Sequence, residues 1–191
     1  MTGVTVSLEL LDLQPRYVRD CLKVLIHSIL FTRELGIVVP RQVESECGLT
    51  YLTIDDINTD KYIEERLCAF EERLAETGQL ELVLSFYTRV RKKAFLFFKD
   101  FAKVVWEEWI IPVRIHADSP LDSQSDERSL RLTAGELRKR MDKILKHVFE
   151  NRDHIPPMGP TDSTELIRYP FELRCPSVPW HRALTKALSS S

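Results

Sequence analysis

The residue types that do chemistry in enzymes occur in this chain, but not at the spacings that catalysis requires. Glu107 and Glu108 lie next to each other between Trp106 and Trp109, in a segment with the alternation of a β-strand. Adjacent strand residues point to opposite faces of a sheet, so these two carboxylates cannot act as an acid–base pair. The chain has no Gly-x-Ser-x-Gly sequence and too few glycines for a phosphate-binding loop. We therefore expect a protein without a catalytic site.

The histidines and cysteines do not form a metal-ligand pattern either. The histidines are His27, His116, His147, His154 and His181, with neither His-x-x-x-His nor Cys-His spacing. The four cysteines include no Cys-x-x-Cys pair. Cys21 and Cys68 fall on the apolar sides of predicted helices, where a free thiol packs as a small hydrophobic group. We expect no metal, no cofactor and four reduced thiols, as in a cytoplasmic protein.

The segment from Gln79 to His116 has the residue types of a binding surface. Two runs of alternating apolar residues, 80–86 and 106–115, predict two strands that each bury one face. A basic run and a phenylalanine cluster lie between them, and aromatic groups concentrated at one connection favour contact with a partner. The basic run comprises Arg89, Arg91, Lys92 and Lys93, and the cluster comprises Phe95, Phe97, Phe98 and Phe101.

Each of these two groups has two interpretations. The basic run is most simply a solvated strand end; the alternative is contact with anionic lipid, where each cation contributes ~1 kcal/mol. The phenylalanines have helical spacing, so we expect Phe98 and Phe101 to pack against the domain and Phe95 or Phe97 to be more exposed. Burial of one ring contributes ~2–3 kcal/mol, which favours packing.

Composition and charge exclude several other classes of protein. The 191 residues are 43% hydrophobic and 29% charged, as expected for one soluble globular domain. A net charge of −2 provides no general basic surface for nucleic acid. No apolar run approaches the ~20 residues of a membrane span, and the N-terminal residues lack the pattern of a signal peptide.

Periodicity along the chain predicts an α+β domain, with helices on one face of a largely antiparallel sheet. The expected order is a strand at 4–11, a helix at 15–36, strands at 37–45 and 49–55, a helix from 58–59 to 78, the two strands described above, a third helix and a strand at 166–174. Asn58 or Thr59 is the expected cap of the second helix, and Gly78 its end. Pro112 and Pro170 favour edge positions or bulges in their strands.

The third helix is expected to begin at a capping box of Thr133 and Glu136, after a mobile loop at 118–129. Its inward side is predicted to carry Leu137, Met141, Ile144 and Val148. An adjoining flank carries Arg138, Asp142, Leu145 and Phe149. This flank is either part of a wide buried stripe or a contact surface for another helix, and both interpretations stay open.

The order of these elements and the residues inside them resemble the HORMA domain family, in its autophagy-related branch. The resemblance extends from Val4 to Arg174, and three segments carry it most clearly: 84–93, 106–109 and 149–158. We therefore expect a HORMA domain with three main helices at residues 1–175. Residues 176–191 are expected to form a tail with a short amphipathic helix.

The resemblance also implies a function. Such a protein is a non-catalytic cytoplasmic adaptor that forms a heterodimer with the HORMA domain of autophagy-related protein 13. It stabilises the autophagy-initiation kinase complex and reaches the preautophagosomal structure when autophagy is induced. HORMA pairs use the third helix, which makes Arg138, Asp142, Leu145 and Phe149 the expected partner contacts.

Relatives use a tryptophan and a phenylalanine on a loop before the double-tryptophan strand to recruit later factors. The matching residues here are Phe95, Phe97 and Phe98, without a tryptophan. One alternative function is a peripheral membrane or phosphoinositide-binding module that uses the basic run and the aromatic residues. Another is capture of a peptide under the C-terminal segment, which needs a longer ordered tail than 166–191 supplies.

Overall fold

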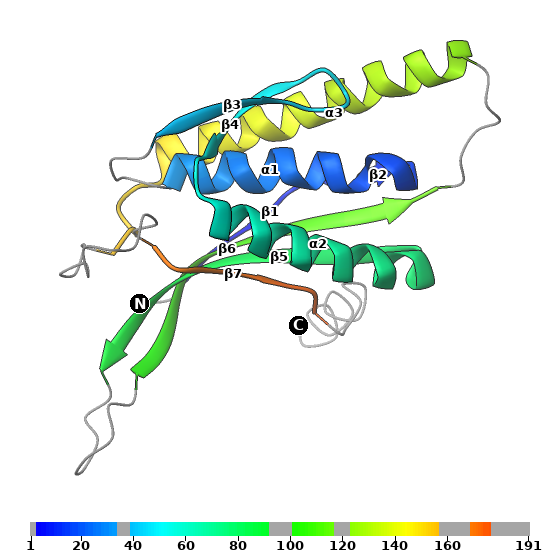
Figure 1. Ribbon diagram of the computed structural model, residues 1–191. Coiled ribbons are helices and arrows are strands. Elements are labelled where there is room, and N and C mark those ends of the chain that lie inside the picture. The colour runs from blue at the N-terminus through cyan, green and yellow to red at the C-terminus, as the bar shows by residue number, and fades with distance from the viewer. Residues whose placement is uncertain (1–2, 34–38, 92–100, 117–122, 157–168, 177–191) are drawn as a thin grey trace, which may run out of the picture.

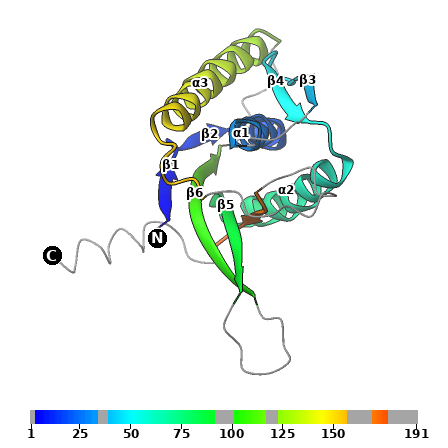
Figure 2. The ribbon, with the colours of Figure 1, turned by 90° about the vertical axis from the view of Figure 1, so that its left-hand side faces the viewer.

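A mixed, mostly antiparallel sheet carries three long helices on one face (Figures 1 and 2). The computed structural model describes residues 3–33, 39–91, 101–116, 123–156 and 169–176. The strands of the sheet are β1 (Val4–Ser7), β2 (Leu11–Leu13), β5 (Gln79–Arg91), β6 (Phe101–Ile115) and β7 (Phe171–Arg174). Their order is β1-β6-β5-β7, and β2 also pairs with β6. The predicted α+β class is confirmed.

The segment predicted as one strand, residues 4–11, is interrupted, and the interruption explains an unexpected proline. Both β1 and β2 pair in parallel with β6, but β1 ends opposite Ile110 and β2 begins opposite Val113. Pro112 lies between these two positions in a central strand, so of the two locations expected for it, an edge or a bulge, the edge is wrong. A proline lacks the N–H of a ladder, and β6 accommodates it where the neighbouring strand is broken.

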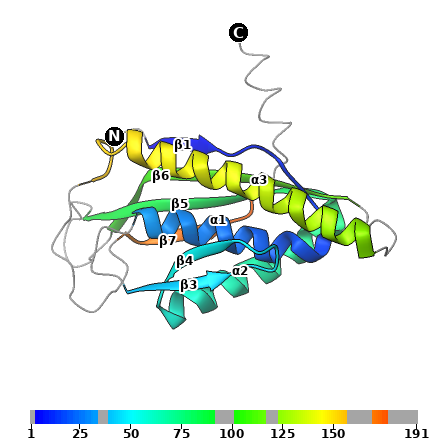
Figure 3. The same cartoon turned by 90° about the horizontal axis from the view of Figure 1, so that it is seen from above.

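Helix α1 (Val18–Arg33) is buried on most of its sides, as its apolar composition predicts. It lies between α2 (Ile57–Thr77) and α3 (Ser123–Glu150), with the hairpin of β3 (Pro40–Glu44) and β4 (Thr50–Ile54) packed against it. Seen from above, α3 lies over the β1 side of the sheet and α2 over the β7 side (Figure 3). The core is therefore formed between the sheet and α1.

The two ends of α2 differ in how well the sequence predicted them. Asp56 is the N-cap and accepts hydrogen bonds from the backbone N–H groups of Asn58 and Thr59, so neither of those two is the cap. Gly78 ends the helix at a φ of 72°, and its N–H donates to the carbonyl of Leu74. This left-handed position favours glycine, which is why the end was predictable.

Helix α3 begins ten residues before its expected start. Residues 123–129 are helical, and Thr133 and Glu136 lie inside the helix, so the predicted loop over these residues and the capping box are both wrong. No proline occurs between Ser123 and Pro156, and Leu130 packs against the core. A polar composition alone does not end a helix when one of its sides can still reach the core. No helix in the described ranges is long and apolar enough to cross a membrane.

Candidate partner-binding surface

The outward side of α3 carries the flank that the sequence singled out. Leu145 is 53% exposed and Phe149 is 76% exposed, while Leu137 and Ile144 on the inward side are fully buried. The flank is therefore not part of a wide buried stripe. We define the α3 stripe as Arg131, Gly135, Arg138, Asp142, Leu145 and Phe149, which follow one another at alternating spacings of four and three residues.

The α3 stripe is apolar at its C-terminal end, carries exposed charges in its middle and has open space beside Gly135. Arg138 and Asp142 are exposed, and the Arg152 guanidinium lies 4.9 Å from the centre of the Phe149 ring. At Gly135, apart from the adjoining backbone of α3, no atom lies within 4 Å of the position that a Cβ would take. Spacings of four and three keep one line of a helix facing a neighbouring helix, and the glycine allows close approach of a backbone. The stripe has the form of a helix-contact surface.

Polar contacts on another side of α3 hold the helix against the sheet. Lys143 Nζ donates to the carbonyl of Ser7 at 3.0 Å and pairs with Glu9. Arg140 is almost fully buried and donates from Nε to the carbonyl of Glu9 at 3.1 Å and from Nη2 to that of Leu10. These bonds fix α3 on the connection between β1 and β2. The stripe is thus displayed on a rigid support.

A buried polar cluster lies at the C-terminal end of α3, and the sequence did not predict it. Glu107 is fully buried and accepts hydrogen bonds from Arg33 Nε at 2.8 Å, from Arg33 Nη2 at 2.6 Å and from Trp109 Nε1. His154 Nε2 lies 2.5 Å from Glu107 Oε2. Arg33 comes from the end of α1, Glu107 from β6 and His154 from the segment after α3. The cluster joins these three parts of the fold.

A β-bulge explains why Glu107 and its neighbour Trp106 are both buried. The register between β5 and β6 shifts so that Phe86 pairs with Glu107 and Tyr87 with Val105, which leaves Trp106 as the extra residue. The Trp106 ring packs against Phe86, His154 and Tyr169, at centroid distances of 5.3, 5.8 and 5.1 Å. Glu108 is only half-buried, so the pair is separated, as the sequence predicted.

The side of the cluster nearest α3 contains His147 and Asn151. The Trp109 ring meets His147 edge-on at 5.2 Å, and Arg33 Nη1 donates to the carbonyl of Asn151 at 3.4 Å. Burial lowers the pKa of His147. Because these groups flank Phe149 in sequence, the cluster positions the apolar end of the α3 stripe. The sequence Trp106-Glu107-Glu108-Trp109, with a tryptophan on each side of an acidic pair, is the feature that could have indicated this buried cluster.

The expectation for the phenylalanine cluster is wrong at the position that can be checked. Phe101 is 46% exposed, and Val90 and Val104 are exposed beside it. Strand pairing continues to Arg91 opposite Phe101, so this end of the hairpin is extended rather than helical and has little of the core beneath it. Phe95, Phe97, Phe98, Lys92 and Lys93 lie outside the described residues.

Of the basic run, the structure describes only one side chain. Arg89 is exposed near the end of the hairpin, and Arg91 is described by its strand pairing alone. Lys103 lies opposite Arg89, with its Nζ 4.2 Å from the centre of the Tyr87 ring, and it pairs with Glu172. The solvated-strand-end interpretation fits Arg89.

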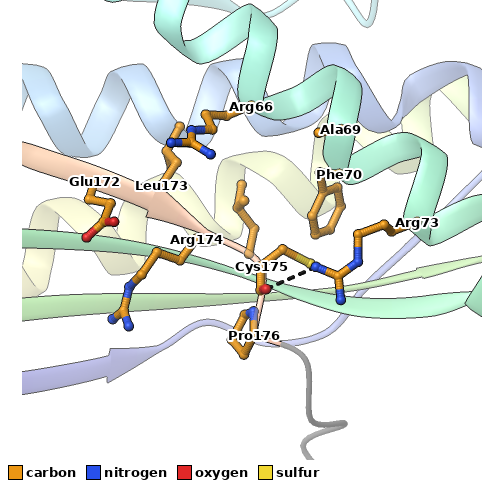
Figure 4. Close-up of a pocket in the computed structure, with 10 residues that line it drawn as sticks. Arg66, Ala69, Phe70, Arg73, Glu172, Leu173, Arg174, Cys175 and Pro176 are labelled. Atoms are coloured by element: carbon orange, nitrogen blue, oxygen red, sulfur yellow. Dashed lines mark hydrogen bonds between the residues drawn. The ribbon is translucent and has the colours of Figure 1, made fainter.

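A cavity of about 440 Å³ opens between α2 and β7 (Figure 4). Its apolar lining includes Phe70, Leu82 and Leu173. Arg73 at its rim donates to the carbonyl of Cys175 at 3.1 Å, and Arg66 lies over the Tyr62 ring. These two arginines are held by groups of the chain itself, so the cavity is less open to a charged ligand than its composition suggests. No pattern considered in the sequence predicted this cavity.

The part of the chain that matches known proteins contains both the α3 stripe and the buried polar cluster around Glu107. The profile of the family described as autophagy-related protein 101 matches residues 10–162. The autophagy-related protein 101 of Arabidopsis thaliana is 29% identical over 190 residues, which is 90% of this chain and 86% of the relative. The matched range includes α1, β6 and all of α3.

Proposed function

Because this chain belongs to the autophagy-related protein 101 family, whose fold is of the HORMA type, we propose that it is a non-catalytic adaptor of autophagy initiation. It forms a heterodimer with the HORMA domain of autophagy-related protein 13 and stabilises the autophagy-initiation kinase complex. It acts in the cytoplasm and reaches the preautophagosomal structure when autophagy is induced. Residues 1–175 form the HORMA domain of this proposal, and 176–191 its tail.

The α3 stripe is the observation that supports pairing. Leu145 and Phe149 lie one helical turn apart and are both largely exposed. Burying such a side chain at an interface contributes ~1.5–3 kcal/mol, which makes both residues candidates for the centre of a contact. Arg138 and Asp142 continue the same line and supply charges that fix the register of the partner. A helix of the partner domain is the occupant that this spacing fits.

The rigid support of the stripe favours a stable pair over a transient one. Arg140 and Lys143 tie α3 to the sheet, and the Glu107 cluster ties its C-terminal end to α1. A surface that is already ordered loses little conformational entropy when it binds. The apolar side chains are therefore presented to the partner in their binding geometry.

Calorimetric titration of the purified HORMA domain of autophagy-related protein 13 tests this proposal. Combined Leu145→Asp and Phe149→Asp should weaken binding by ~100-fold or more, since two central apolar contacts of at least ~1.5 kcal/mol each are lost. Ile57→Asp is the matched control, because Ile57 is also exposed but lies on α2. Equal affinity of the double variant and the wild type, with both folded by circular dichroism, would contradict the assignment.

The hairpin end supports a second candidate function, a peripheral membrane or phosphoinositide contact. Arg89 lies there beside the exposed Val90, Phe101 and Val104, and a cation next to exposed apolar groups suits an anionic membrane surface. Vesicle flotation with anionic lipid is the test. Loss of flotation after Arg89, Arg91, Lys92 and Lys93 are changed to serine would favour this function. Absence of flotation by the wild-type chain would exclude it.

A further inference from the structure

Two cysteines that are 26 positions apart lie together where the β3–β4 turn packs on α1. Cys21 is fully buried in α1, and Cys47 is a half-buried residue of the turn that packs against the same core. The Glu46 N–H donates to Asp20 Oδ2 at 3.1 Å, which holds the turn on this part of α1. Cys47 packs against the core cluster that contains Cys21, and the interaction between the two thiols is the first cause of the pKa shift of each. The turn thus brings one thiol from each element to the same part of the core.

The other two cysteines have different surroundings. Cys68 is exposed on α2, so its predicted place in the core is wrong, and Cys175 is half-buried beside β7. Neither has a cysteine partner among the contacts of the described residues. They serve as internal references for the pair.

Cys47 is the more reactive thiol of the pair. The hydrogen bond from Cys21 lowers the pKa of Cys47 to about 6, and the Ser45 hydroxyl, 3.2 Å from its sulfur, acts in the same direction. Partial burial and the Asp20 carboxylate oppose these effects. The Ser45 Oγ accepts from the Leu49 N–H at 2.9 Å, which leaves the hydroxyl hydrogen available to the sulfur.

Cys21 is suited to the opposite role. Its interaction with Cys47, its burial and Asp20 raise its pKa, and Arg140 only partly offsets them. A buried thiol that stays protonated is protected from direct oxidation, because the thiolate is the reactive form. It remains in place to react with an oxidised neighbour. An accessible thiolate beside a second thiol is the arrangement of a redox-sensing pair.

We propose that Cys47 and Cys21 form a peroxide-responsive pair that closes to a disulfide between the β3–β4 turn and α1. The Cys47 thiolate attacks one oxygen of hydrogen peroxide, the O–O bond breaks, and hydroxide leaves and is protonated to water. The resulting sulfenic acid is attacked by Cys21, which gives up its proton as the S–O bond breaks and a second water leaves. The two thiols are oxidised by two electrons, and the peroxide is reduced.

The bond would restrain the hairpin on α1. A disulfide stabilises a fold chiefly by limiting the conformations of the unfolded chain. The oxidised protein should therefore unfold at a higher denaturant concentration than the reduced one, and reductant should reverse the shift. In a reducing compartment such a bond is transient and reports exposure to oxidant.

Peptide mapping by mass spectrometry under non-reducing conditions tests the pair in the full chain. Treatment with hydrogen peroxide at pH 7 should produce a Cys21–Cys47 peptide that disappears with dithiothreitol. In Cys21→Ser, a dimedone adduct should accumulate at Cys47, since the sulfenic acid has no partner. A chain in which Cys68 is oxidised but no Cys21–Cys47 peptide forms would overturn the proposal.

The pH profile of iodoacetamide labelling provides a second readout that needs no variant. Half-maximal labelling of Cys47 should occur near pH 6, well below the pKa of about 8.5 of an unperturbed thiol. Cys21→Ser should move the Cys47 profile to higher pH if it folds. A wild-type profile of Cys47 with its midpoint at about pH 8.5, as for an unperturbed thiol, would contradict the pairing, whatever the variant does.

Discussion

Arg33 and Glu107, 74 residues apart in sequence, form an ion pair from which solvent is excluded on both sides. Arg33 Nε and Nη2 lie 2.8 and 2.6 Å from the two carboxylate oxygens, a bidentate geometry that suits a guanidinium. The pair joins the end of α1 to the middle of β6. Each charge depends on the other, because an unpaired buried ion has lost its hydration without compensation.

Removing one member of this pair should destabilise the fold strongly. We expect Arg33→Met to lower the free energy of unfolding by ~3–5 kcal/mol, because Glu107 is left buried without its main partner. Chemical denaturation measures the effect. Arg33→Met combined with Glu107→Gln should recover part of the loss, since the charge is then removed as well. If the Arg33→Met variant alone is as stable as the wild type, Glu107 is not buried as a charge.

The pH dependence of stability should include a contribution from His27. Burial lowers the pKa of His27 to about 4, and Asp60 only partly counteracts this. Between pH 6.5 and 4 the unfolded chain binds a proton on His27 that the folded protein does not. The free energy of unfolding should therefore fall by on the order of 3 kcal/mol as the pH drops through this window. In His27→Gln, urea denaturation from pH 7 to 4 should show a smaller decrease; an unchanged decrease would refute this.

The two sides of α3 should respond differently to truncation. Leu137→Ala should cost ~2–5 kcal/mol, because Leu137 is fully buried and its removal leaves a cavity. Leu145→Ala should change the stability of the isolated protein by less than ~0.5 kcal/mol, as expected for an exposed site. Denaturation of both variants without a partner makes the comparison. A large cost at Leu145 would mean that the isolated chain already covers the stripe.

The end of the β5–β6 hairpin should contribute little to stability. Phe86 is buried against Trp106, so Phe86→Ala should cost ~3–5 kcal/mol. Phe101→Ala should be nearly silent, since the ring is half exposed. Thermal unfolding of the two variants distinguishes the positions. Strong destabilisation by Phe101→Ala would instead support the expectation from helical spacing that Phe101 packs against the domain.

Two glycines should respond to alanine with opposite signs. Gly78→Ala should destabilise the protein by ~1 kcal/mol, because an L-residue is strained at a φ of 72°. Gly135→Ala should stabilise it by ~0.5–1 kcal/mol, because Gly135 lies inside α3 with open space around it and alanine is the better helix former. Denaturant midpoints of both variants give the test. Equal signs would contradict the assigned backbone conformations.

Local patterns along the chain determined much of this architecture. The alternation at 80–86 and 106–115 predicted the central hairpin, and Gly78 predicted the end of α2, because each depends on a few neighbouring residues. The apolar periodicity of α3 separated the inward Leu137 and Ile144 from the flank with Leu145 and Phe149. Whether that flank is exposed was decided by the packing of α3 on the sheet, which no local pattern contains.

Only the tertiary structure decided which polar groups are buried and which groups meet. The alternation of a strand placed Glu107 and Glu108 on opposite faces, but only the packing buried Glu107 against Arg33. Cys21 and Cys47 looked unrelated until the β3–β4 turn packed on α1. Both contacts join residues that are far apart in sequence, so they depend on how whole elements pack. The sequence by itself determined the helices and strands and their inward faces. The buried ion pair of Arg33 and Glu107 and the pair of Cys21 and Cys47 depend on the packing of segments that are distant in sequence.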